Sequence, residues 1–419
     1  MTTREATAHR ATTRPGIAFL RPQLGIGGAE RLVLDAATQY QARGCDVRFF
    51  VPDSCTGPQF AEVTARQVSI TSVRPLVPLQ LGGRLRAPLA LARTAAAARS
   101  LAATLDRTDV VFCDVVAHVI PYVKRMMRCP VMYYCHFPDL LLTSDGARES
   151  APYRWYRRLI DAREESGMLA ADRVLVNSAF TASVVREWLP GLPTDRLQVV
   201  HPGVPIPAAP IAMPPDDADS PIRLLSISRF DPRKNVPLAV EALAALRPLV
   251  PEPVFARVRL VLAGRFDERL SEQQVLLNQL RARAAALGVG SQVEIELSPS
   301  PAARDALLAA SRCVIYTPAA EHFGYVPVEA MAAGRPVVAA NHAGPSETIV
   351  DGRTGLLRPP TATAFADALR TYVMDAAEAG RVGRAAAAHV AGHFSIEAFG
   401  NRLWAATSPL IGECRDART

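Results

Sequence analysis

Residues 17–51 read IAFLRPQLGIGGAERLVLDAATQYQARGCDVRFFV and set the pattern that the rest of the chain repeats. A short apolar run at 17–20 is followed by a helical pattern from about 28 to 43 and by a second apolar run at 47–51. This order is typical of a β-α-β unit, in which a helix connects two parallel strands and covers their sheet. The stretch therefore predicts an α/β protein built on parallel sheets.

The same alternation occurs in both halves of the 419 residues, a length that is too great for one ordinary core. We predict two Rossmann-like, doubly wound parallel-sheet domains that face each other across a cleft. After the first unit, strands of the N-terminal half are expected at 110–113, 131–135, 173–176 and 197–200. Strands of the C-terminal half are expected at 223–227, 258–262, 292–295, 313–316 and 337–339.

Prolines between Pro202 and Pro221 interrupt both patterns and predict the interdomain linker. We therefore place a disordered tail at 1–14, an N-terminal domain at 15–204, a proline-rich linker at 205–221 and a C-terminal domain at 222–396. A final helix at about 397–415 could return to the N-terminal domain, and an organelle transit segment is the alternative for the tail. Three aspartates in the linker are expected to form a solvated spacer: Asp216, Asp217 and Asp219.

The composition, 49% hydrophobic and 21% charged, is ordinary for a folded globular protein. No run approaches the roughly 18 uninterrupted apolar residues of a membrane span. Seven cysteines occur without a C-x-x-C pair, which predicts reduced thiols in a cytosolic setting. Phosphate-loop, nucleophile-elbow and zinc motifs are absent from the sequence, so we expect no dedicated metal.

The excess of positive charge belongs to the first half, where residues 1–205 contain 25 Lys+Arg and 18 Asp+Glu. This half contains an arginine-rich segment, 74–107, which suits a membrane surface or a phosphate-binding face; the alternative is the solvated face of a helix. Nucleic acid is disfavoured because the segment lacks interleaved aromatic residues. The arginines of the segment are Arg74, Arg84, Arg86, Arg93, Arg99 and Arg107.

Ligands of doubly wound sheets bind beyond the carboxyl ends of the strands, so residues directly after strands are the candidates. Gly27 and Gly28 follow the first strand and open a helix, where backbone N–H groups can approach a phosphate; a tight turn is the alternative. Arg229 and Lys234 follow the strand at 223–227 and suit a diphosphate. Lys234 is one of only two lysines in the chain, although chance explains its position as well.

His136 follows the strand at 131–135, where it could hydrogen-bond a sugar or simply pack. Glu321 and Glu329 follow the strand at 313–316 and are separated by seven residues. A helix that begins near Gly324 would offer a diphosphate its free N–H groups, and one carboxylate could then hold a sugar hydroxyl and the other a ribose. An acidic loop before an ordinary amphipathic helix is the alternative. The candidates at the start of this helix are Gly324, Tyr325 and Val326.

Four segments carry a resemblance to a known family: LGIGGAERLVLDAA at 24–37, YCHFPDLLL at 134–142, VNSAFTA at 176–182 and YTPAAEHFGYVPVEAM at 316–331. The chain resembles the retaining glycosyltransferases of family 4, which have the two-domain GT-B fold, over nearly its whole length. Within that family it is most similar to the α-1,3/1,6-mannosyltransferases that assemble dolichol-linked oligosaccharides for protein N-glycosylation.

The resemblance implies a GDP-mannose donor and a diphosphate-lipid glycan acceptor, a mannosyl chitobiose extended by an α-1,3 and then an α-1,6 mannose, with no metal or other cofactor. It implies that Arg229 and Lys234 bind the diphosphate, that Glu329 binds the ribose, and that Glu321 and His136 bind the mannose. The glycines at 27 and 28 would face the phosphates.

The implied location is the cytosolic face of the endoplasmic reticulum membrane, or the cytoplasm and inner-membrane surface of a bacterial host, with contact through the basic N-terminal domain. Two other functions stay open. One is a related hexosyltransferase that uses a GDP- or UDP-sugar on another lipid or on a soluble glycan. The other is a non-catalytic protein that binds nucleotide sugars.

Overall fold

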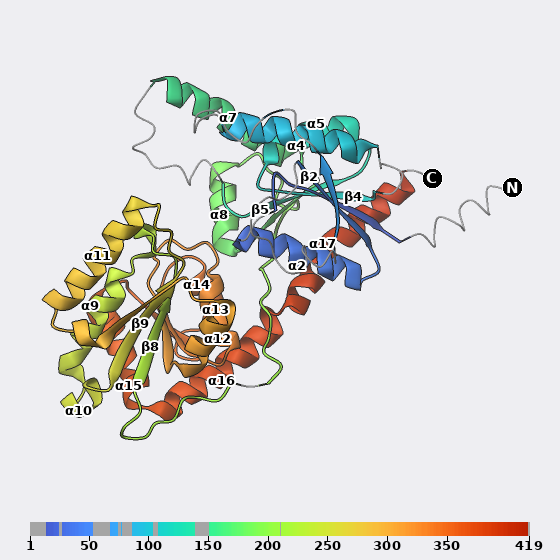
Figure 1. Ribbon diagram of the computed structural model, residues 1–419. Coiled ribbons are helices and arrows are strands. Elements are labelled where there is room, and N and C mark those ends of the chain that lie inside the picture. Colours follow the sequence, from blue (N-terminus) through green and yellow to red (C-terminus); the bar gives the residue numbers. More distant parts are fainter. Residues whose placement is uncertain are drawn as a thin grey trace. The chain divides into compact units, whose positions relative to one another are not determined.

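The computed structural model describes residues 14–24, 27–52, 68–73, 77, 86–103, 108–138, 151–209 and 211–417, with side chains omitted at 86–88, 151–154 and 156 (Figure 1). Two compact units make up the chain. The N-terminal unit comprises Met1–Gly203 together with Phe399–Thr419, and the C-terminal unit is Val204–Ala398.

The N-terminal unit is built on a seven-stranded sheet in the order β3-β2-β1-β4-β5-β6-β7, and every neighbouring pair is parallel. Its strands are β1 Gly16–Leu20, β2 Asp46–Pro52, β3 Ser69–Val73, β4 Val110–Asp114, β5 Val131–Cys135, β6 Arg173–Val176 and β7 Leu197–Val199. Its helices are α2 Gly28–Ala42, the short 3-10 helix η2 Ala117–Val119, α4 Arg86–Ala102, α5 Ile120–Met126, α7 Ala151–Ala170, α8 Ala179–Trp188 and α17 Ile396–Asp416.

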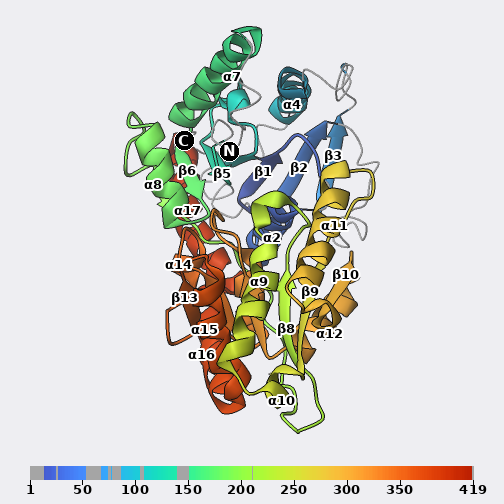
Figure 2. The ribbon, with the colours of Figure 1, turned by 90° about the vertical axis from the view of Figure 1, so that its left-hand side faces the viewer.

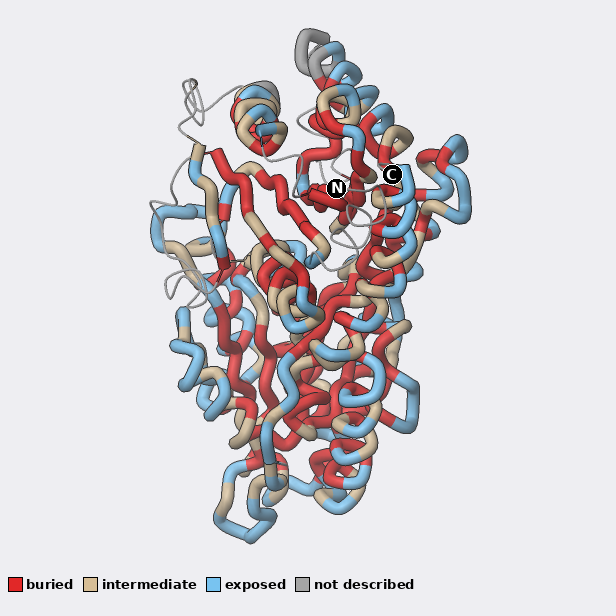
Figure 3. The backbone as a smooth tube through the Cα atoms, turned by 90° about the vertical axis from the view of Figure 1, so that its right-hand side faces the viewer, coloured by how far each residue is buried: buried red, intermediate tan, exposed pale blue. Residues whose placement is uncertain are grey.

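Both faces of this sheet are covered, which is why β1, β4 and β5 are buried at every residue (Figure 3). One face packs with α2 and α17, and the other packs with α4, α5 and α8. The last helix, α17, reaches this core from the far end of the sequence through apolar residues such as Phe399 and Leu403. The hydroxyl groups of Tyr40 in α2 and Thr407 in α17 are 2.5 Å apart.

The C-terminal unit has a six-stranded sheet in the order β10-β9-β8-β11-β12-β13, again parallel throughout. Its strands are β8 Ile222–Ile227, β9 Val258–Gly264, β10 Val293–Leu297, β11 Cys313–Tyr316, β12 Val337–Ala340 and β13 Gly355–Arg358. Its helices are α9 Pro237–Leu246, α10 Glu252–Phe255, α11 Ser271–Ala286, α12 Pro301–Ala310, α13 Tyr325–Ala332, α14 Pro345–Thr348, α15 Ala362–Met374 and α16 Ala376–His393.

Helices also cover this second sheet on both faces. Figure 2 shows α9 and α11 against one face, where they share a core with α15. The opposite face packs with α12, α13 and α16. Three short 3-10 helices connect the larger elements: η4 Pro232–Lys234, η5 Arg247–Leu249 and η6 Gly290–Gln292.

The prediction of two doubly wound parallel-sheet domains is confirmed. Two strands, β3 and β13, were not expected from the sequence, and each lies at an edge of its sheet. An edge strand pairs on one side only, so its residues need not be apolar; β3 has no buried residue, and β13 ends half-buried. The apolar run by which the other strands are recognised is therefore weak or absent here.

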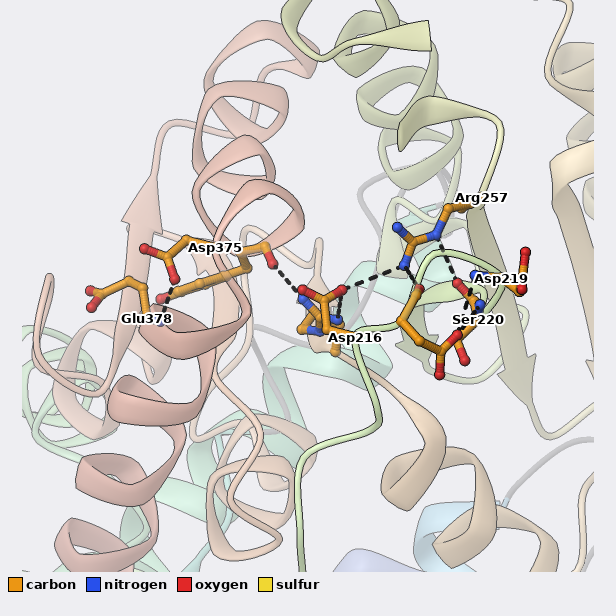
Figure 4. A network of polar contacts seen from close by, with 9 residues as sticks. Asp216, Asp219, Ser220, Arg257, Asp375 and Glu378 are labelled. Atoms are coloured by element: carbon orange, nitrogen blue, oxygen red, sulfur yellow. Dashed lines mark hydrogen bonds and ion pairs between the residues drawn. The ribbon is translucent and has the colours of Figure 1, made fainter. Parts of the chain in front are cut away.

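The proline-rich segment is tied to the C-terminal unit by arginine side chains rather than by helix or strand. Arg335, which is fully buried, donates to the Ala212 carbonyl at 2.6 Å. Arg312, 2% exposed, pairs with Asp216 at 2.8 Å, and Arg257 approaches the same carboxylate (Figure 4). Asp216 is 44% exposed, as expected of a solvated spacer, and it also supplies the counter-charge of the buried Arg312 guanidinium.

The arginine-rich segment 74–107 is only partly within the described residues. Arg74, Arg84, Arg107 and the side chain of Arg86 lie outside them. Arg93 is buried and donates to the carbonyl of Pro52, so it contributes to packing and not to a charged face. Arg99 is exposed and donates to Tyr122. Within the described parts of the chain, every helix is too short or too polar to cross a bilayer.

Candidate functional site

Each sheet reverses its strand order at one point, between β1 and β4 in the N-terminal unit and between β8 and β11 in the C-terminal unit. Neighbouring connections leave in opposite directions at such a point, which opens a crevice beyond the carboxyl ends of the two strands. The predicted residues follow these strands or their neighbours. Gly27 follows β1, His136 follows β5, Lys234 follows β8 and Glu321 follows β11.

Lys234 and Glu321 meet in the C-terminal unit although 87 residues separate them in sequence. The Lys234 ammonium and the Glu321 carboxylate form an ion pair at 2.5 Å, and the Tyr316 hydroxyl donates to the same carboxylate at 2.8 Å. Their backbones are also held, because Thr317 donates to the Lys234 carbonyl and the Gly344 N–H donates to the Glu321 carbonyl. The pair is therefore fixed by the fold before any ligand binds.

This cluster keeps the carboxylate of Glu321 ionised. Burial would raise the pKa of Glu321, but the Lys234 charge and the hydrogen bonds from Lys234 and Tyr316 outweigh it and lower the pKa. Burial, together with the adjacent carboxylate, raises the pKa of Tyr316 well above its usual range, so Tyr316 stays a donor. The carboxylate has about four lone-pair positions and retains capacity to accept a ligand hydroxyl.

Helix α13 begins immediately after this cluster. Its N-cap is Gly324, with a φ of +83° that lies in the left-handed region favoured by glycine. Glycine has no side chain with which to cap a helix, and the first turn of α13 contains no acidic residue. The positive end of the helix dipole, at Tyr325 and Val326, is thus left without a protein carboxylate in that turn.

Glu329 lies in the second turn of α13 and pairs with Arg304 of α12. Burial raises the pKa of Glu329, while the guanidinium of Arg304 opposes the shift. Arg304 therefore favours the ionised form of this carboxylate, against the larger effect of burial.

Arg229 has the most exposed side chain among the predicted cations, at 60%. The carboxylate of Asp231 lies 3.9 Å from it and is already held by Arg233 at 2.8 Å. The hydrogen bond from Arg233 lowers the pKa of Asp231 to about 2. With that carboxylate committed to Arg233, the guanidinium of Arg229 remains open to an anionic ligand.

In the N-terminal unit, two carboxylates connect the start of α2 and His136 to a buried arginine. Gly27 is the N-cap of α2 in an extended conformation, and Gly28 is the first helical residue. Arg21, 1% exposed, pairs with Glu30 in the first turn of α2 at 3.2 Å and with Asp114 at the end of β4 at 3.3 Å. The Nε2 atom of His136 lies 3.5 Å from the same Asp114 carboxylate.

Comparison with solved structures identifies the fold. Sucrose-phosphate synthase from Thermosynechococcus elongatus superimposes with a TM-score of 0.74 at 20% identity, covering 96% of this chain and 100% of that one. The HepE protein of Anabaena, solved in complex with UDP, superimposes with a TM-score of 0.71 at 20% identity over 94% of this chain and 100% of its own. In sequence, residues 26–206 match Glycosyltransferase Family 4 and residues 215–389 match Glycosyl transferases group 1.

Relatives similar over nearly their full length decide the family. The α-1,3/1,6-mannosyltransferase ALG2 of Mus musculus is 37% identical over 96% of this chain and 99% of its own. The human ALG2 protein is also 37% identical, over 95% of this chain and 97% of its own. The ALG2 protein of Saccharomyces cerevisiae is 31% identical, over 84% of this chain and 76% of its own. The chain belongs to the ALG2 family of α-1,3/1,6-mannosyltransferases. It is a glycosyltransferase, which moves a sugar from an activated donor to an acceptor.

In this member of the ALG2 family, the structure brings Lys234 and Glu321 into direct contact and pairs His136 with a carboxylate. Arg229 and Glu329 pair with other residues, Arg229 with Asp231 and Glu329 with Arg304. The roles of these residues toward a ligand stay predictions.

Five polar residues that contact the predicted ones or their partners were not predicted as site residues in this ALG2-family chain: Arg21, Glu30, Asp114, Arg304 and Tyr316. Asp114 could have been found, because it directly follows the expected strand at 110–113, as the other candidates follow theirs. Arg304 has no such signal, since it lies inside a helix that follows β10. Among the described residues, no group of three or more His, Cys, Asp or Glu side chains is placed to hold a metal ion.

Proposed function

We propose that this chain transfers mannose from GDP-mannose to a mannosyl chitobiose carried on a diphosphate-lipid, first in α-1,3 and then in α-1,6 linkage. The observation that carries the proposal is the similarity to α-1,3/1,6-mannosyltransferases, which extends over 96% of this chain and 99% of the mouse relative. The product would be a precursor for protein N-glycosylation. The charged residues at the two strand-order reversals supply a consistent chemistry for the donor.

For the diphosphate we propose Lys234, Arg229 and the first turn of α13. Lys234 has three N–H donors and can keep Glu321 while it contacts a phosphate oxygen. Arg229 is exposed and can donate two parallel hydrogen bonds to phosphate. The departing GDP gains negative charge in the transition state, so fixed cations and a helix N-terminus placed there would lower the barrier without a metal ion.

For the sugar we propose Glu321 and His136, and for the ribose Glu329. Glu321 is ionised and fixed, so it can accept hydrogen bonds from the hydroxyl groups of the sugar. Glu329 is paired with Arg304 and can accept hydrogen bonds from both ribose hydroxyls through its remaining lone pairs. We propose that the acceptor hydroxyl attacks on the face that the diphosphate leaves and that the diphosphate takes its proton, which retains the configuration of the mannose.

For the acceptor lipid we propose contact through the basic N-terminal unit at a membrane surface, on the cytosolic face. The positive excess of residues 1–205 supports this, because anionic lipid headgroups attract clustered Lys and Arg. Binding of the purified chain to vesicles with and without anionic lipid, followed by sedimentation, tests the contact. Equal sedimentation with neutral and anionic vesicles would contradict the electrostatic contact.

The function is tested with GDP-mannose and a synthetic diphosphate-lipid chitobiose that carries one mannose, with products read by mass spectrometry. Addition of two mannoses is expected. Calorimetric titration with GDP and with UDP separates the donor alternatives, and tight UDP binding without GDP binding would refute the mannosyl assignment. A related hexosyltransferase would transfer sugar when GDP-mannose in this assay is replaced by another nucleotide sugar.

The role of Glu321 is tested by Glu321→Gln, with Glu294→Gln on the exposed face of β10 as the control. We expect Glu321→Gln to lower transfer about a hundredfold, the size typical for the loss of one fixed transition-state contact, while the control stays at the wild-type rate. Full transfer activity in Glu321→Gln would remove this residue from the reaction.

A further inference from the structure

The orientation of His136 is set by groups that the sequence reasoning did not include. Its Nε2 atom is buried and lies 3.5 Å from Asp114 Oδ2. The ring also stacks obliquely on Tyr134, with centroids 5.1 Å apart, and Asn177 donates to the His136 carbonyl at 2.9 Å. The side chain is still 26% exposed, so with Nε2 directed inward, Nδ1 is the ring nitrogen left for a ligand.

Asp114 is itself held from two directions. Its carboxylate is 2% exposed and pairs with the buried guanidinium of Arg21 at 3.3 Å. The next residue, Val115, has a φ of +66°, and the Val116 N–H bonds back to the Asp114 carbonyl at 2.7 Å. This is a γ-turn of the rare, strained kind, and a β-branched residue keeps that conformation only where the surrounding structure imposes it. Strain of this kind at the end of a central strand indicates that the orientation of the Asp114 carboxylate matters for function.

We propose that Asp114 is a positioning residue, which turns the Nε2 edge of the His136 ring inward and thereby presents Nδ1 to the ligand, with Arg21 holding the carboxylate. An imidazole that donates from one nitrogen keeps the other as an acceptor, so the group facing Nε2 decides the tautomer. At 3.5 Å the contact is longer than a normal hydrogen bond, as is common in ligand-free sites that tighten on binding. Nδ1 then accepts a hydrogen bond from a hydroxyl group of the sugar. This role rests on the function proposed above.

Arg21 extends this arrangement to the glycine turn. It donates to the Ala29 carbonyl at 3.3 Å and pairs with Glu30, whose carboxylate lies over Gly27, within 2.5 Å of the position that a Cβ would take there. One buried guanidinium thus connects the start of α2 with the carboxylate that faces His136. Removal of Asp114 alone would leave this guanidinium buried with half of its counter-charge, so the test removes both partners.

The test compares two double variants that each delete an Arg–Asp pair touching one end of β4. Arg21→Met with Asp114→Leu removes the pair beside His136. Arg415→Met with Asp109→Leu removes the pair at the start of the strand, where Arg415 lies 3.1 Å from Asp109. Long-range proton–nitrogen NMR of chains with labelled histidine, at a pH where the ring is neutral, reports the tautomer; His136→Gln identifies the signals.

We expect wild type and the Asp109 control to show His136 protonated at Nε2, and the Asp114 variant to show a mixture. For GDP-mannose turnover we expect kcat/KM to fall about tenfold to a hundredfold in the Asp114 variant, because the reacting sugar is misplaced, with no change in the Kd for GDP. An unchanged tautomer in the Asp114 variant would overturn the proposal. If wild type fails to use GDP-mannose, the proposed function is wrong, but the tautomer still decides the role of Asp114.

Discussion

Replacement of Lys234 by alanine is the sharpest test of the cluster in the C-terminal unit. Lys234 and Glu321 are only 20% and 19% exposed, so removal of the ammonium leaves a carboxylate that is mostly buried and has lost its counter-charge. A hydrogen bond to a charged group contributes about 1.5–3 kcal/mol. For a unit of this size that corresponds to a decrease of about 3–12 °C in the unfolding midpoint at pH 7.

The effect of Lys234→Ala should depend on pH. In the wild type the pKa of Glu321 is lowered, so the pair stabilises the folded chain at neutral pH, and this contribution is lost as the pH falls through that pKa. In the variant the Lys234 charge no longer opposes the effect of burial, so the pKa of Glu321 rises. The buried carboxylate then destabilises the folded chain until it is protonated. The unfolding midpoints of the wild type and the variant should therefore converge as the pH falls from about 7 to about 4, since the ordinary pKa of a glutamate is near 4.

The only other lysine of the chain provides the control. Lys124 pairs with Asp172 at 2.7 Å, but these side chains are 35% and 31% exposed. Solvent screens such a pair, so we expect Lys124→Ala to lose less than about 1 kcal/mol and to bind GDP as the wild type does. Lys234→Ala should bind GDP about tenfold to a hundredfold more weakly in calorimetry. Equal, pH-independent losses in the two variants, with unchanged GDP affinity, would refute the reasoning.

Three further outcomes are expected. In Gly344→Ala the new Cβ would come within 2.4 Å of the Phe323 backbone, so the loop must move and GDP affinity should fall about tenfold, whereas Gly392→Ala, with nothing near it, should leave GDP affinity intact. Arg304→Ala should raise the pKa of Glu329 further, so GDP binding measured by calorimetry should weaken at about pH 5 and recover as the pH rises to about 8. Absence of this pH trend would mean that Glu329 does not contact the ribose. Excess EDTA should leave mannose transfer unchanged, and an EDTA loss restored by a divalent cation would contradict the metal-free proposal.

The residues after strands could be predicted because the position of a strand is local information. An apolar run such as 131–135 identifies a strand, and the fold class then places the next residue, His136, at the ligand edge of the sheet. The same rule located Lys234 and Glu321. It could not show that they bond to each other, since no local pattern spans 87 residues.

The sequence by itself determined the fold class, the two-sheet organisation and the helix opened by Gly27 and Gly28, because burial on both faces of a parallel sheet demands continuous apolar runs. Only the tertiary structure decided the partners of the buried charges. Arg21 with Asp114, Arg304 with Glu329 and Arg312 with Asp216 all join different elements. A charge taken out of water must find its counter-charge in space, and distance along the chain does not restrict where that partner lies.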